Sequence, residues 1–197
     1  MFSVGLTGGV ATGKTTASNF FSEKGIDIID ADEISRSLQS IGASGYQEIV
    51  KKFGNEILNI DKSINRKTLR EIAFKEPEQK KWLEDLMHPM IRDEVIKQFE
   101  EVESVWAIYS APLWSNKNVF NRTLVIDAPK HLQLARIKER DSINPEIAEG
   151  IINAQISSND RINYATDLII NDATIDAFNS KLDFYYNLYS KLASKKS

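Results

Sequence analysis

Residues 8–15, with the sequence GGVATGKT, constrain the fold more than any other stretch of this chain. In the spacing G-x-x-x-x-G-K-T, glycines let successive backbone N–H groups point at phosphate oxygens, while the lysine adds a positive charge and the threonine hydroxyl can bind Mg²⁺. An apolar run at 2–6 precedes the motif and a helix-like segment follows it, as the motif requires. The stretch therefore predicts a phosphate-binding loop between a strand and a helix.

Composition narrows the kind of protein that carries this loop. The chain has 197 residues, a net charge of −3, two histidines and no cysteine. Without a basic surface, a long nucleic acid is an unexpected partner, and without cysteine the chain forms no disulfide, thiolate nucleophile or cysteine-ligated zinc site. The sequence contains no signal-peptide pattern and no apolar run near the ~20 residues of a membrane span, so we expect a cytoplasmic protein with no membrane contact.

Short apolar runs alternate with helical patterns along the chain, which predicts an α/β protein with a five-stranded, doubly wound parallel sheet flanked by helices. The expected strands are 2–6, 26–30, 105–109, 123–127 and 167–170. The expected helices around them are 15–24, 130–140 and 175–192. Between the second and third strands the apolar residues instead recur at helical spacing, and this predicts a helical insertion with helices at 46–53, 66–74, 77–87 and 89–102.

The second expected strand ends in Asp30-Ala31-Asp32. Ligands bind at the carboxyl ends of strands in open α/β sheets, so these carboxylates are candidate catalytic or metal-binding groups. Aspartate is also a common helix N-cap, and a helix is expected to start near Glu33. The two roles can coexist, with one aspartate in each.

Arginine and histidine supply the other candidate site residues. Arg136 and Arg140 are spaced i, i+4 on one helix face, where they either clamp triphosphate oxygens or form a charged surface on which Arg136 pairs with Glu139. In the insertion, Arg66 is either a ligand contact or a solvated side chain. His88 precedes a proline, a position typical of a helix boundary.

Several classes of nucleotide-binding protein are disfavoured by the sequence. A GTPase switch protein carries an N-K-x-D base-recognition motif, and the nearest match, 116–119, lacks the aspartate. A motor ATPase commonly ends a strand in acidic residues, whereas the third expected strand ends in Tyr109-Ser110. The helical insertion and the polar helical segment 141–165, which suits a mobile lid, favour a small-molecule kinase.

A set of short motifs recurs in a fixed order along nearly the whole chain: LTGGVATGKT at 6–15, IDAD at 29–32, NR at 65–66, LR at 69–70, WLE at 82–84, HP at 88–89, PL at 112–113, QL at 133–134, RD at 140–141, Gln155 and Asp167. By this series the sequence resembles the dephospho-CoA kinase family. The resemblance implies a P-loop kinase core at 1–34, 103–140 and 166–197, a CoA-binding helical subdomain at about 35–102 and a helical lid at about 141–165, all within a single domain.

The resemblance also implies a reaction, which is transfer of the ATP γ-phosphoryl group to the ribose 3′-hydroxyl of dephospho-CoA in the final step of coenzyme A biosynthesis. The resemblance implies that the catalytic residues are Asp32, Lys14 and Arg140, with Asp32 as the base. The residues implied to bind ATP are Gly8, Gly9, Ala11, Thr12, Gly13, Lys14, Thr15, Thr16 and Arg136. Asp32, Arg66 and His88 would contact dephospho-CoA, and Thr15 and Asp32 would hold Mg²⁺.

Several positions depart from the family pattern: Ala11 where glycine is usual, Asn65 for aspartate, Ser110 and Asn116 for acidic residues, Ile151 for arginine, and an incomplete N-x-G at 171–173. The lysine, threonine, aspartate and arginine named as catalytic or metal-binding are all present, so an active enzyme is expected, as a monomer or weak homo-oligomer. The alternatives are a nucleoside or nucleotide kinase of the same fold and a catalytically impaired, ATP-binding regulatory protein.

Overall fold

The computed structural model describes residues 1–111 and 120–195. Contacts divide the chain into two compact units, one formed by Met1–Ile29 with Val102–Ser197 and the other by Asp30–Glu101. The first unit contains the phosphate-binding loop and the second contains the helical insertion.

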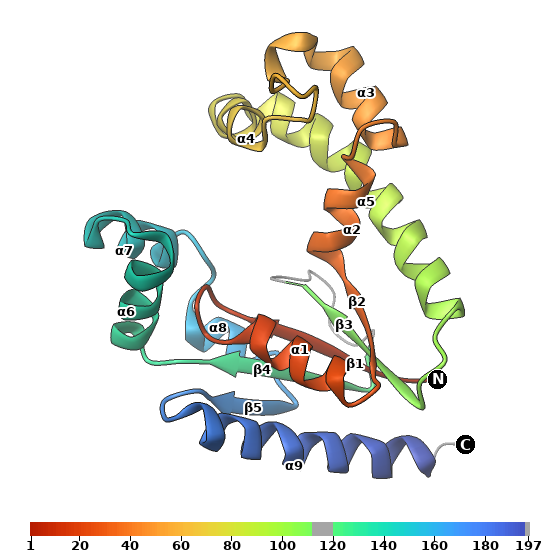
Figure 1. Cartoon of the computed structure of the whole chain (residues 1–197), viewed down its shortest axis with the longest axis vertical. Helices are drawn as coiled ribbons and strands as arrows, with labels where there is room; N and C mark the ends of the chain where they lie inside the picture. Colours follow the sequence, from red (N-terminus) through yellow and green to blue (C-terminus); the bar gives the residue numbers. More distant parts are fainter. Residues whose placement is uncertain (112–119, 196–197) are drawn as a thin grey trace. The chain divides into compact units, whose positions relative to one another are not determined.

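The first unit is built on a five-stranded sheet with the order β2-β3-β1-β4-β5 (Figure 1). Its strands are β1 (Phe2–Gly8), β2 (Asp27–Asp30), β3 (Trp106–Ser110), β4 (Arg122–Asp127) and β5 (Asp167–Ile170). β1 pairs in parallel with β3 and β4, and β4 pairs in parallel with β5. The apolar runs are buried on both faces, as is typical of parallel strands, and the expected five-stranded parallel sheet is confirmed.

The helices of the first unit in its described residues are α1 (Lys14–Glu23), α6 (Lys130–Asp141), α7 (Pro145–Asn153), α8 (Ser158–Ile162) and α9 (Ile175–Ser194). α1 and α9 share one hydrophobic cluster with the strands, to which Ala17, Phe21, Phe178, Leu182 and Tyr189 contribute. These residues belong to the faces that helical periodicity predicts to be apolar and buried. Helical spacing predicts the same apolar face for Ile175, but this residue is exposed and lines a cavity at the start of α9.

The second unit is helical in its described part and has its own hydrophobic cluster, centred on Ile49, Ile57, Ile64, Leu69 and Met87. Its elements are α2 (Ala31–Leu38), α3 (Ser44–Phe53), the 3₁₀ helix η1 (Asn55–Ile57), α4 (Arg66–Lys75) and α5 (Pro77–Glu100). α2 begins two residues earlier than expected because the Asp30 side chain caps it, accepting the N–H groups of Asp32 and Glu33 at 2.9 and 3.1 Å.

The prediction of separate helices at 77–87 and 89–102 is wrong, since α5 is one helix that continues through Pro89. Proline removes one intrahelical hydrogen bond and crowds the preceding turn. Here the helix packs into the cluster of the second unit on both sides of the proline, through Leu86 and Met87 before it and Ile91 after it. This packing stabilises the helix on both sides of Pro89. His88 therefore lies inside a helix rather than at a boundary.

Two sequence expectations fall on residues that the structure does not describe. Pro112, expected to end the third strand, and the segment 116–119, which includes Asn116, both lie outside the described ranges.

Candidate active site

The predicted phosphate-binding loop connects the end of β1 to the start of α1, and its backbone is tightly confined. Gly13 has φ 109° and Ala11 has φ 57°, both in the left-handed region. A Cβ atom on Gly8 would lie 2.7 Å from the carbonyl oxygen of Ile126, and one on Gly13 would lie 2.6 Å from the Asn171 side-chain nitrogen. Glycine is thus required at both positions, whereas Ala11 carries a methyl group in a conformation that most residues avoid.

The carbonyl groups of the loop are held by side chains from elsewhere in the first unit. Arg136 of α6 donates from Nη1 to the carbonyl of Ala11 at 3.2 Å and from Nη2 to the carbonyl of Asn171 at 3.1 Å. The Asn171 amide donates to the carbonyl of Thr12 at 2.8 Å, and the Thr12 hydroxyl donates to the carbonyl of Gly9 at 2.9 Å. Because the carbonyls are turned toward these donors, the loop can present amide groups on its other side.

Lys14 is the first residue of α1, and its ammonium group donates to the Ser110 hydroxyl at 2.9 Å. Ser110 is the last residue of β3, next to β1 in the sheet. The neighbouring strand therefore positions the lysine side chain through a neutral hydroxyl, where the family pattern has an acidic residue. Thr15 and Thr16 follow in the first turn of α1, where backbone N–H groups have no carbonyl partner one turn earlier in the helix.

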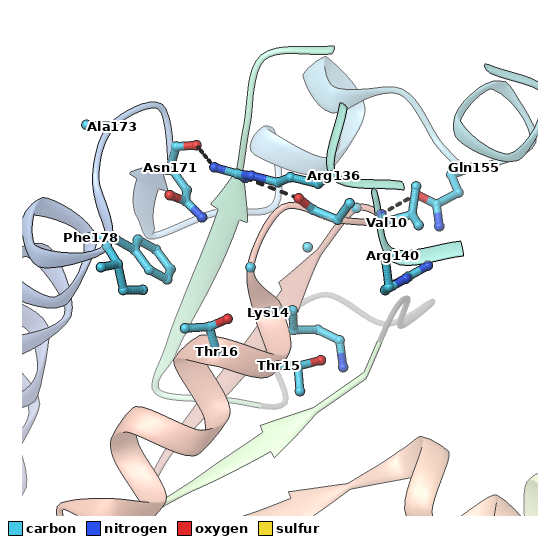
Figure 2. A pocket seen from close by; sticks show the side chains of 15 residues that line it. Val10, Lys14, Thr15, Thr16, Arg136, Arg140, Gln155, Asn171, Ala173 and Phe178 are labelled. Atoms are coloured by element: carbon cyan, nitrogen blue, oxygen red, sulfur yellow. Dashed lines mark hydrogen bonds between the residues drawn. The ribbon is translucent and has the colours of Figure 1, made fainter. Parts of the chain in front are cut away.

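A cavity of about 680 Å³ opens at this loop (Figure 2). Its lining includes the predicted loop residues together with Arg136, Arg140, Gln155, Asn171 and Phe178. Amide dipoles at the start of a helix, one lysine and two arginines make this a site for a polyanion, and the Phe178 ring adds an apolar surface.

The structure gives Arg136 and Arg140 different partners. Arg136 donates to the two backbone carbonyls described above, so its guanidinium supports the loop while also lining the cavity. Arg140 forms a bidentate pair with Asp141, with Nε and Nη2 at 2.8 and 2.7 Å from the two carboxylate oxygens. This hydrogen-bonded pairing raises the pKa of Arg140 and lowers the pKa of Asp141.

A second group of polar residues lies at the same end of the sheet. Gln155, between α7 and α8, accepts the Val10 N–H of the loop at 2.9 Å. Arg161 of α8 is only 5% exposed, and a Cβ atom on Gly9 would lie 2.9 Å from its Nη1. Asp127, the last residue of β4, is 7% exposed and accepts the Ser158 hydroxyl at 2.6 Å.

The sequence singles out Ser110 and Asn171 only as positions that depart from the family pattern. It does not predict their hydrogen bonds, and it does not single out Arg161 at all. Ser110 directly ends β3 and Asn171 directly follows β5, so the rule that ligand sites form at the carboxyl ends of parallel strands would have indicated both. Arg161 lies in a polar helical stretch, and no local pattern separates it from a solvated arginine.

The acceptor-side candidates Asp32, Arg66 and His88 all lie in the second unit. Asp32 is in the first turn of α2 and is not the residue whose side chain caps it, since Asp30 does that. Arg66 is the first residue of α4, which Asn65 caps by accepting the Thr68 N–H at 3.1 Å. Asn65 thus serves as a helix cap at a position where the family pattern has aspartate.

Residues 1–111 and 120–195 contain no cluster of three or more histidine, aspartate or glutamate side chains that could hold a metal ion. They also contain no helix that is both long and apolar enough to span a membrane.

Comparison with known proteins agrees with the site. Residues 2–177 match the family model described as dephospho-CoA kinase. A dephospho-CoA kinase of Salmonella typhimurium is 36% identical over 98% of this chain and 96% of its own length, and one of Pseudoalteromonas translucida is 38% identical over 98% and 93%. The solved dephospho-CoA kinase of Campylobacter jejuni superposes with a TM-score of 0.64 at 28% identity, covering 96% of this chain and 97% of its own. The chain belongs to the dephospho-CoA kinase family.

Proposed function

We propose that this protein transfers the γ-phosphoryl group of ATP to the ribose 3′-hydroxyl of dephospho-CoA, giving coenzyme A and ADP. The observation that carries the proposal is the cavity at the phosphate-binding loop, which Lys14, Arg136 and Arg140 line, in a chain of this family. Phosphoryl transfer depends on positioning and on charge stabilisation more than on covalent chemistry, and this cavity is suited to both.

The donor half of the reaction belongs to the first unit. The amide groups of residues 11–16, which include Ala11, Thr12, Gly13, Lys14, Thr15 and Thr16, surround the ATP phosphates, and the Lys14 ammonium group neutralises oxygens of the β- and γ-phosphates. Arg140 exchanges Asp141 for the transferred phosphoryl group, because a guanidinium fork binds a carboxylate and a phosphate with similar geometry. The conformation of the loop is maintained by Gly8, Gly9 and Arg136.

The acceptor half is assigned to Asp32, with Arg66 and His88 as further contacts to dephospho-CoA. The Asp32 carboxylate accepts the proton of the 3′-hydroxyl as the hydroxyl oxygen bonds to the γ-phosphorus. The bond between that phosphorus and the β–γ bridging oxygen breaks, and its electron pair leaves on ADP. Because Asp30 supplies the N-cap of α2, the Asp32 side chain is available for this role.

Mg²⁺ would be held by the Thr15 hydroxyl and the Asp32 carboxylate. The donor set fits, because Mg²⁺ in kinase sites takes one or two protein oxygens and fills its other positions with phosphate oxygens and water. The exposed Thr15 side chain lines the cavity at the start of α1. When bound, the ion neutralises charge on the β- and γ-phosphates. We further propose that the protein acts in the cytoplasm, as a monomer or weak homo-oligomer.

Incubation of the protein with ATP, Mg²⁺ and dephospho-CoA is expected to yield coenzyme A and ADP, which chromatography separates. Lys14→Ala is the control, since it removes the mobile charge from the loop. Turnover no higher than that of the control would overturn the proposal. A nucleoside phosphorylated in its place would identify a nucleoside or nucleotide kinase, and ATP binding without transfer to any acceptor would identify a regulatory protein.

Asp32→Asn is expected to keep ATP affinity within a few-fold of wild type and to lower kcat by roughly 10²–10⁴, the range of general-base contributions. The amide keeps the size of the carboxylate and loses its basicity. Single-turnover kinetics with saturating dephospho-CoA measures the chemical step directly. An unchanged rate would remove Asp32 from the role of base.

A further inference from the structure

The outer side of the phosphate-binding loop contacts the segment between α7 and α8. Gln155, two residues after α7, accepts the Val10 N–H at 2.9 Å through its side-chain oxygen. Val10 lies just before the stretch 11–16 whose amides are assigned to the ATP phosphates. The hydrogen bond to Gln155 therefore fixes the orientation of the Val10 amide, directly before the phosphate-binding part of the loop.

The Arg161 side chain lies next to Gly9, the residue before Val10 in the loop. The arginine is 5% exposed, and its Nη1 lies so close to Gly9 that an added Cβ atom would be 2.9 Å from it. The same hypothetical Cβ atom would lie 3.4 Å from Gln155 Oε1. Gly9 is thus covered by both side chains, and its lack of a side chain is what lets them approach.

Gln155 and Arg161 also belong to one local structure. Arg161 Nη2 donates to the carbonyl of Ile156 at 3.2 Å, which fixes the backbone beside Gln155. Arg161 Nε has no hydrogen-bond partner among residues 1–111 and 120–195, although the side chain is buried. Burial of a guanidinium that is incompletely hydrogen-bonded opposes folding, so contact with the loop offers a reason for its position.

We propose that Gln155 and Arg161 are positioning residues that hold Gly9 and Val10 in the conformation that binds the ATP phosphates. We call this pair the α7–α8 brace. The inference rests on the proposed function, because it assigns the loop to ATP. The inference adds that the conformation of the loop depends on the helical segment 141–165. Displacement of α7 and α8 would then weaken the binding of ATP phosphates by the loop.

The expected size of the effect is set by the one neutral hydrogen bond between Gln155 and Val10, and an effect of the same order is expected from the close contact of Arg161 with Gly9. Removing such a bond from a preorganised site weakens binding roughly 3- to 10-fold. The loss falls on ATP, because the brace contacts the loop. Affinity for dephospho-CoA and the rate of the transfer step at saturating ATP are expected to change less than about twofold.

Gln155→Met tests the brace, since methionine keeps the length of the side chain and loses the oxygen acceptor. Arg161→Lys is the second variant, chosen because it keeps the buried charge and removes the planar contact with Gly9. Asn159→Ala is the matched control, because Asn159 is exposed on α8 between the two. Calorimetric titration with the β,γ-imido analogue of ATP and Mg²⁺ gives the Kd, and steady-state kinetics gives KM and kcat for both substrates.

Support for the brace is a Kd and a KM for the nucleotide that rise roughly 3- to 10-fold in Gln155→Met and in Arg161→Lys, with kcat near wild type and Asn159→Ala unchanged. General destabilisation would instead lower kcat, through loss of active protein, and leave both KM values unchanged. That result, or a Kd equal to that of the control, would overturn the brace. A wild-type protein that fails to bind the nucleotide would overturn the donor-site proposal as well.

Discussion

Two arginine–aspartate arrangements lie at opposite ends of β4, and they differ in how completely their charges are satisfied. At the start of the strand, Arg122 forms a bidentate pair with Asp167 at 2.8 and 2.5 Å, and the Tyr189 hydroxyl donates to the same carboxylate at 2.9 Å. At the end of the strand lie Asp127 and Arg161. Within the described ranges, Asp127 Oδ1 and Arg161 Nε have no hydrogen-bond partner.

The pKa directions follow this difference. The hydrogen bonds that Arg122 donates to the Asp167 carboxylate raise the pKa of Arg122, whereas burial lowers the pKa of Arg161 despite the nearby charge of Asp127. A satisfied pair joins strands β4 and β5 to helix α9 and contributes to stability. Asp127 and Arg161, each with one unsatisfied buried atom, lie near the phosphate-binding loop, where a site retains groups that a purely structural core would not.

The largest effect on stability is expected from Asp167→Asn, at roughly 2–4 kcal/mol of unfolding free energy, because it leaves Arg122 without its carboxylate partner. Urea unfolding followed by circular dichroism measures the loss. ATP affinity is expected to stay at the wild-type value, since the pair lies at the end of β4 away from the loop.

Asp127→Asn is the matched substitution at the other end of the strand. Its expected cost is smaller, at about 1 kcal/mol, because an amide oxygen can still accept the Ser158 hydroxyl and the loss is confined to the charge attraction between Asp127 and Arg161. Equal losses in the two variants would contradict the distinction between the pairs.

A smaller effect is expected at alkaline pH. Burial, reinforced by the charge of Asp167, raises the pKa of Tyr189 above its ordinary value of 10.0. The fold therefore favours the neutral phenol, and the associated stability is fully present below about pH 10 and declines as the pH rises above that value. Relative to Tyr189→Phe, the wild-type protein should lose unfolding free energy as the pH rises from about 10 to about 11. Parallel pH-stability curves for the two proteins would contradict this account.

The smallest effect is expected at a third, exposed pair. Asp141→Asn releases Arg140 from its bidentate partner and should lower KM for ATP by roughly two- to threefold, since exposed ion pairs are weak. Glu139→Gln makes the same charge change on the same helix and serves as the control. If both variants lower KM equally, the gain comes from net charge and the Arg140–Asp141 pair does not compete with ATP.

The sequence predicted the elements whose signals are local and repeated. The loop motif, five apolar runs and helical spacing in α1 and α9 were sufficient for the sheet and its covering helices. The course of α5 was not predictable, because continuation through Pro89 depends on packing against α3 and α4, which lie earlier in the chain. Tertiary contacts here outweigh a residue that breaks most helices.

The candidate site divides in the same way. Lys14 and Thr15 are identified by spacing alone, and Asp30 behaves as the helix cap that its residue type allows. The Val10–Gln155 and Gly9–Arg161 contacts join residues far apart in sequence, so no window of the chain contains the signal. Arg136 was predicted in part. Its place on the same helix face as Arg140 follows from the sequence, whereas its hydrogen bond to the carbonyl of Ala11 does not.

The position of β1 in the sheet also has a consequence for the order of folding. β1 lies between β3 and β4, and its first residue, Phe2, is paired with Trp106. The intervening unit Asp30–Glu101 is continuous in sequence and has its own hydrophobic cluster. The contacts within this unit join residues close in sequence, so forming them costs little chain entropy. The sheet forms only after a long loop has closed, because both neighbours of β1 come later in the chain. During synthesis the helical insertion can thus fold before β3 and β4 are available to pair with β1, the strand that leads into the phosphate-binding loop.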